Sequence, residues 1–97
     1  MAQLTWSPEA VNDLTKIAEF VAQNSGDPQY VLGNLLKASE RITLFPRSGR
    51  LIPEYNDSNR REVLWKSYRI MYQLKGEDVL VTAVIHGARD FRLEIPE

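Results

Sequence analysis

Residues 84–91, VIHGARDF, contain the only histidine of the chain, and an arginine follows it three residues later. Histidine is suited to act as a general base near neutral pH, and arginine grips anionic oxygens through two parallel hydrogen bonds. His86 and Arg89 are therefore candidates for a catalytic pair. The alternative is structural, because Gly87 permits a turn with positive φ and Asp90 can cap the next segment or pair with an arginine. We favour the structural interpretation, in which these residues end a strand and turn a corner.

Other cationic side chains that could hold an anion gather in the middle of the sequence. The candidates are Arg60, Arg61, Lys66 and Arg69. Residues 41–75 carry eight basic and three acidic side chains, whereas the segments before and after are both net acidic. Such a basic band can meet phosphate or an acidic protein surface, or it can only neutralise the rest of the fold. The net charge of −1 for the whole chain argues against a general nucleic-acid binder.

The first half of the chain predicts one short strand and two helices. Residues 3–6 alternate between polar and apolar, as a strand does. The Ser-Pro pair at 7–8 and the Asp-Pro pair at 27–28 each provide a capping side chain followed by a proline suited to the first helical turn. Apolar residues at helical spacing follow both pairs, and we expect the helices to end near Gly26 and Pro46. The short connection predicts an antiparallel helix hairpin.

The second half predicts three strands in a meander. The segments 61–66, 68–74 and 79–85 are rich in Val, Ile, Leu, Trp and Tyr, and residues 75–78, KGED, predict a hairpin turn. Tyr68 and Tyr72 share one face, so Arg69 lies on the other, where we expect it to point toward solvent or a partner. Helices grouped on one side of an antiparallel sheet make an α+β fold.

Length and composition set the remaining expectations. The 97 residues fit a single domain, 1–97. There is no cysteine, so disulfides and thiolate metal sites are excluded, and we expect neither a metal nor another cofactor. No apolar run approaches the roughly 20 residues of a membrane helix, and the N-terminus lacks the pattern of a signal peptide. We therefore expect a cytoplasmic protein with no membrane partner.

Four segments of the chain resemble the RelE/ParE superfamily, the toxins of type II toxin–antitoxin systems. They are WSPEAVNDLTKIAEFVA, LFPRSGRLIPE, RREVLWKSYRIMYQL and VLVTAVIHGARD, in that order. The resemblance implies a small twisted antiparallel sheet with the N-terminal strand and a two-helix hairpin packed on one face. It also implies a cognate antitoxin that silences the toxin, with a homodimer or a hetero-oligomer with the antitoxin as possible assemblies.

The RelE branch of this superfamily consists of ribosome-dependent messenger RNA endoribonucleases that need no metal. Such chemistry requires a base for the 2′-hydroxyl, cations for the pentavalent phosphate and an acid for the leaving oxygen. Resemblance to this branch would make Arg69 and Arg89 the phosphate contacts, with Lys66 and His86 as further catalytic candidates. However, the tail FRLEIPE lacks the tyrosine or histidine typical of the branch, and the isoelectric point of about 5.8 is low for a protein that enters an RNA-lined site.

The ParE branch inhibits DNA gyrase by binding and has no known catalytic function, and HGARD after the last strand is typical of it. We therefore favour a ParE-like toxin, with Arg60, Arg61, Arg69 and Arg89 as the residues that bind a partner or nucleic acid. Ribosome-dependent cleavage of messenger RNA remains the alternative. A third possibility is a member that only binds its antitoxin and represses their shared promoter.

Overall fold

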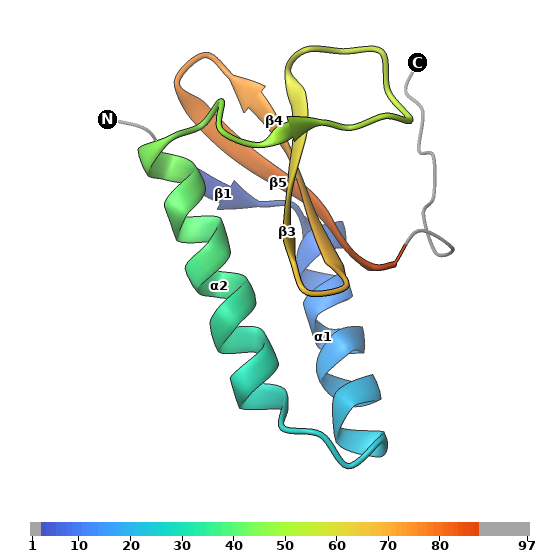
Figure 1. The fold of residues 1–97 in the computed structure, drawn as a ribbon. Coiled ribbons are helices and arrows are strands. Elements are labelled where there is room, and N and C mark those ends of the chain that lie inside the picture. The colour runs from blue at the N-terminus through green and yellow to red at the C-terminus, as the bar shows by residue number, and fades with distance from the viewer. Residues whose placement is uncertain (1–2, 88–97) are drawn as a thin grey trace.

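The computed structural model describes residues 3–87 of the chain. The elements in chain order are β1 (Leu4–Trp6), α1 (Pro8–Gln23), α2 (Pro28–Leu44), β2 (Arg50–Leu51), β3 (Arg60–Trp65), β4 (Tyr68–Lys75) and β5 (Asp78–His86). The strands form one twisted sheet in the order β1-β5-β4-β3-β2, and the helix hairpin lies across one side of it (Figure 1). The predicted α+β fold is confirmed.

The sheet is mixed rather than wholly antiparallel. Strands β2 to β5 pair antiparallel with their neighbours, but β1 pairs parallel with β5, with Leu4 opposite Val79 and Trp6 opposite Val81. The parallel pair arises because the chain leaves β1 through the helix hairpin and returns to it only with the last strand, as parallel pairs require. The sequence did not predict β2, because a strand of two residues is too short to show alternation.

The helices begin where the sequence predicts. The Ser7 hydroxyl accepts a hydrogen bond from the backbone N–H of Ala10 at 3.0 Å, and Pro8 follows it. The Asp27 carboxylate accepts from the N–H of Gln29 at 3.0 Å in the same way, with Pro28 next. These caps satisfy backbone donors that no helical carbonyl can reach.

The main core lies between the helix hairpin and the sheet. Its buried members include Ile17 of α1, Leu35 of α2, and Tyr68, Ile70 and Tyr72 of β4. Successive side chains of a strand point to opposite faces of the sheet, so Arg69 and Met71 lie on the side away from the helices.

A second, smaller core covers that opposite side. Ile52 lies against Met71 and Ile85, each 4% exposed or less, and Tyr55 and Ala83 pack beside them. The segment 50–59 therefore folds over a sheet face that the sequence predicted to be open. As a result β4 is buried on both faces from Tyr68 to Tyr72.

Candidate functional site

Arg69 lies on the predicted face of the sheet, but it is not open to solvent. The residue is 7% exposed, because the segment 50–59 folds over it. Its Nε donates to Glu62 at 2.7 Å, and its two terminal nitrogens donate to the two oxygens of Glu54 at 2.8 and 3.2 Å. The expectation of an outward-pointing Arg69 was therefore wrong. A buried guanidinium needs carboxylate partners, and here the fold supplies two of them.

Glu62 joins a second arginine to this cluster. Its side chain is fully buried, and its other oxygen accepts a hydrogen bond from Nε of Arg50 at 2.5 Å. Arg50, Glu54, Glu62 and Arg69, which we call the ion-pair network, together carry two positive and two negative formal charges. The hydrogen bond from Arg69 lowers the pKa of Glu54, and the bond to Glu54 raises the pKa of Arg69, so both stay charged at neutral pH.

His86 lies at the end of β5 on the helix-covered side of the sheet. It pairs with Tyr68 across the strands, and the two rings lie 4.7 Å apart between centroids. The ring of Phe20 on α1 is also a neighbour of His86, with centroids 6.3 Å apart. The neighbouring cross-strand pair, Arg69 and Ile85, points to the opposite face of the sheet. His86 and Arg69 therefore project from opposite faces and cannot hold one phosphate between them in this arrangement.

Lys66 stands in the tight turn between β3 and β4. Its backbone adopts a left-handed conformation with φ of 53°, and its ammonium lies 5.4 Å from the centre of the Trp65 ring and 5.6 Å from that of Tyr30. This placement makes Lys66 an exposed cation over aromatic faces. Arg89, the remaining catalytic candidate, lies outside the described residues.

Arg60 and Arg61 point to different sides, as their adjacency requires. Arg60 shares the side of Arg69, where its guanidinium lies 4.5 Å from the centre of the Tyr55 ring and 3.6 Å from the Asp57 carboxylate. Arg61 instead donates to the backbone carbonyls of Arg47, Gly49 and Ser58. Its role within the fold is to fix the two loops that flank β2.

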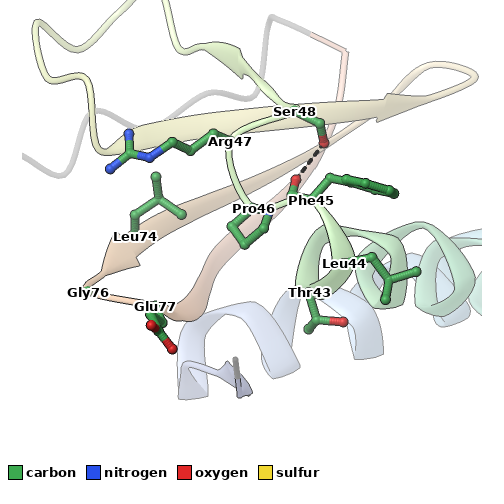
Figure 2. A pocket seen from close by; sticks show the side chains of 9 residues that line it. All are labelled: Thr43, Leu44, Phe45, Pro46, Arg47, Ser48, Leu74, Gly76 and Glu77. Atoms are coloured by element: carbon green, nitrogen blue, oxygen red, sulfur yellow. Dashed lines mark hydrogen bonds between the residues drawn. The ribbon is translucent and has the colours of Figure 1, made fainter. Parts of the chain in front are cut away.

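Hollows lie on both sides of the sheet within residues 3–87. The larger, of about 680 Å³, lies between the end of α2 with the loop after it and the hairpin turn of β4 and β5 (Figure 2). The smaller, of about 250 Å³, lies on the other side of the sheet beside Arg60 and Tyr55. Within residues 3–87 no three His, Asp or Glu side chains are placed to hold a metal ion together, and no helix there is long and apolar enough to cross a membrane.

Sequence reasoning missed the acidic partners that define the environment of Arg69. Arg60, Glu62 and Leu64 are each two residues apart on β3, so they share one face, and Leu64 pairs with Arg69 across the hairpin. The register set by a two-residue turn at 66–67 would have placed Glu62 on the face of Arg69. No comparable signal marks Glu54, because it lies in a loop whose path depends on the second core.

Comparison with known proteins gives a family and a fold. The family model described as the ParE toxin of type II toxin–antitoxin system, parDE, matches residues 4–91. A chain from the chromosomal ParDE toxin–antitoxin system of P. aeruginosa superposes with a TM-score of 0.66 at 17% identity, covering 91% of this chain and 98% of that one. A conserved hypothetical protein of Helicobacter pylori gives 0.57 at 15% identity, covering 87% and 92%. No curated protein matches the sequence.

Proposed function

The chain belongs to the ParE family, the toxins of type II toxin–antitoxin systems, and we propose that it inhibits DNA gyrase by binding, without a chemical step of its own. The observation that carries this proposal is the pairing of Arg69 with Glu54 and Glu62. A ribonuclease would need that guanidinium free to neutralise a pentavalent phosphate. Here its positive charge is already opposed by two carboxylates.

The placement of His86 supports the same conclusion. A general base must reach the proton it removes, directly or through one water. His86 lies beside the rings of Tyr68 and Phe20, on the sheet side opposite Arg69. An RNA cleavage centre built on His86 and Arg69 would require one of the two side chains to move to the other face of the sheet.

A type II toxin is paired with an antitoxin, and we propose that the complex forms over exposed apolar side chains. Several large ones lie at the surface of the described residues: Val11, Phe20, Tyr30, Leu36, Leu44, Phe45, Leu51 and Leu64. An amphipathic helix or strand of an antitoxin would cover part of this set. For gyrase, the exposed cations Arg47 and Lys66 are better contacts than Arg69, because Arg69 is buried. The cytoplasm, where gyrase works, is the proposed location.

Pulse labelling of DNA and protein synthesis in bacteria, after induction of the chain without an antitoxin, tests the proposal. Gyrase inhibition predicts that DNA synthesis stops first while translation continues. An early arrest of translation with continuing replication would reverse the assignment in favour of the ribonuclease.

The His86→Gln variant sharpens this test because a catalytic base and a packing residue respond differently. We expect His86→Gln to keep the arrest of DNA synthesis and the inhibition of supercoiling by purified gyrase. The Lys16→Gln variant, which changes an exposed residue of α1, serves as a surface control. A ribonuclease would lose on the order of a hundredfold or more in RNA cleavage with His86→Gln, and none with the control.

A further inference from the structure

The smaller hollow lies where the sheet departs from regular pairing. Strands β4 and β5 shift register between Met71 and Tyr72, which leaves Thr82 of β5 without a partner on β4. An extra residue of this kind is a β-bulge, and bulges re-aim side chains and are common beside functional sites. Thr82 and Ala83 both line the hollow, although successive side chains of a regular strand face opposite sides. The bulge therefore helps to shape the hollow of about 250 Å³.

Arg60 lines this hollow with a guanidinium that is held in place and still has donors to offer. Its side chain is 18% exposed, and the guanidinium lies over the Tyr55 ring, with Nε 3.6 Å from the Asp57 carboxylate. That separation makes an ion pair but is too long for a hydrogen bond. No buried side-chain nitrogen within residues 3–87 lacks a hydrogen-bond partner, so the N–H groups of Arg60 reach water. They can therefore bond to a bound anionic group.

A negative charge borders the same hollow from the start of α1. Glu9 lines it, and the exposed Glu9 carboxylate makes no ion pair or hydrogen bond with another described residue. Arg60 and Glu9 thus border one hollow without forming an ion pair with each other. The hydroxyls of Ser7 and Thr82, which also line it, already donate to backbone carbonyls. The two charged groups are therefore the main polar contacts that a ligand would find.

The lining between the two charges is apolar. Met71 of β4 and Leu80 and Ala83 of β5 line the hollow, and these two strands lie between β3, which carries Arg60, and β1, which leads into α1. The volume is below the range of about 300–1,000 Å³ that accepts drug-sized ligands. The hollow therefore suits a smaller molecule with a charge at each end and a short apolar chain between them.

We propose that the smaller hollow binds a small zwitterion, an ω-amino acid whose carboxylate bonds to Arg60, whose ammonium pairs with Glu9 and whose aliphatic chain covers the apolar lining. A simple anion fits less well, because the carboxylates of Glu9 and Asp57 oppose it. A simple cation fits less well, because Arg60 repels it. A zwitterion satisfies both ends and adds no net charge. The proposal does not depend on the gyrase target.

Amide NMR titrations of the full chain test the site with γ-aminobutyrate as the probe. The concentration should run from roughly 0.1 mM to roughly 50 mM, since two partly exposed ion pairs give only weak binding. We expect saturable shifts at the amides of Arg60, Thr82 and Ala83. Butyrate and butylammonium each keep only one charged end and should bind about fivefold to tenfold more weakly. Glycine should also bind more weakly, because it is too short to reach both charges.

Two substitutions separate the ends of the ligand. Arg60→Gln should weaken the binding of γ-aminobutyrate and butyrate about fivefold to tenfold and should not weaken that of butylammonium. Glu9→Gln should weaken γ-aminobutyrate and butylammonium by a similar factor and should not weaken butyrate. Glu40→Gln and Arg41→Gln, which remove matched exposed charges on α2, are the controls and should change nothing. Circular dichroism checks that each variant folds.

Thr82→Phe tests the hollow while leaving both charges in place. A ring at the bulge fills the space, so this variant should lose the saturable shifts with every probe, and it keeps the test decisive if Arg60→Gln fails to fold. The absence of saturable shifts with γ-aminobutyrate in the wild-type chain overturns the proposal. So does binding that Thr82→Phe leaves unchanged, or butyrate that binds as tightly as γ-aminobutyrate, because the ammonium would then make no contact.

Discussion

Replacing Arg69 with methionine tests whether this residue holds the fold together or acts on a substrate. The substitution removes three hydrogen bonds, one to Glu62 and two to Glu54. Glu54 lies near the surface, where water can replace Arg69, so the loss of these two hydrogen bonds costs little free energy. Glu62 has a fully buried side chain and would keep only Arg50, which is itself 57% exposed. Removing one partner of a buried ion pair costs about 3–5 kcal/mol, and the remaining bond to Arg50 favours the lower end.

We therefore expect Arg69→Met to lower the free energy of unfolding by about 3 kcal/mol. In a domain of this size that corresponds to roughly 12–24 °C in the midpoint of thermal unfolding. Urea unfolding followed by circular dichroism measures the change. The double variant Glu62→Gln with Arg69→Met should be more stable than the sum of the two single losses by more than about 1 kcal/mol, because the uncompensated buried charge is gone.

A loss of less than about 1 kcal/mol for Arg69→Met would refute this reasoning, since it would mean that the buried carboxylate does not depend on Arg69. A stable Arg69→Met protein that has lost toxicity would point instead to direct contact between Arg69 and the target. A destabilised protein that stays toxic at low temperature would identify Arg69 as a residue of the fold alone.

Three further expectations concern other polar side chains of the fold. Tyr72→Phe should lower the free energy of unfolding by about 1–3 kcal/mol in urea titration, because a backbone N–H and a carbonyl of the loop after α2 lose their partner. Asp13→Ala should cost about 1–3 kcal/mol by the same measurement, since the Asp13 carboxylate accepts from the buried N–H of Val84 at 3.0 Å. The pKa of Glu54 is lowered by Arg69, so its contribution to stability is present above the ordinary carboxyl pKa and is lost as pH falls through the folded value. Glu54→Gln should therefore show a smaller loss of stability on acidification than wild type in unfolding curves at a series of pH values.

The elements were predictable from the sequence where local chemistry determines them. The caps at residues 7–8 and 27–28, the turn at 76–77 and the alternation of β4 are all properties of neighbouring residues. The parallel pairing of β1 with β5 was not predictable, because it joins strands more than 70 residues apart. The hydrophobic pattern and the helix caps are local to one segment, whereas the order of the strands in the sheet depends on the whole chain.

The environment of Arg69 could be predicted only in part. Strand alternation correctly placed it opposite Tyr68 and Tyr72. Its burial depends on the loop 50–59, whose sequence reads as polar and which nevertheless supplies Ile52 and Tyr55 to a second core. A loop that covers a sheet face leaves no periodic signal, so a charged residue on that face looks exposed from the sequence alone.

The ion-pair network also affects how quickly another molecule can find this protein. Two arginines and two glutamates cancel within a few ångströms, and ions in solution screen the residual field over about 8–10 Å. Two of the eight basic side chains of residues 41–75, Arg50 and Arg69, therefore contribute little attractive field at a distance. A macromolecule that approaches this side of the sheet receives little electrostatic guidance, so the encounter proceeds at the roughly 10⁵–10⁶ M⁻¹s⁻¹ of unguided association and changes little with salt. Capture on this side is governed by shape at short range.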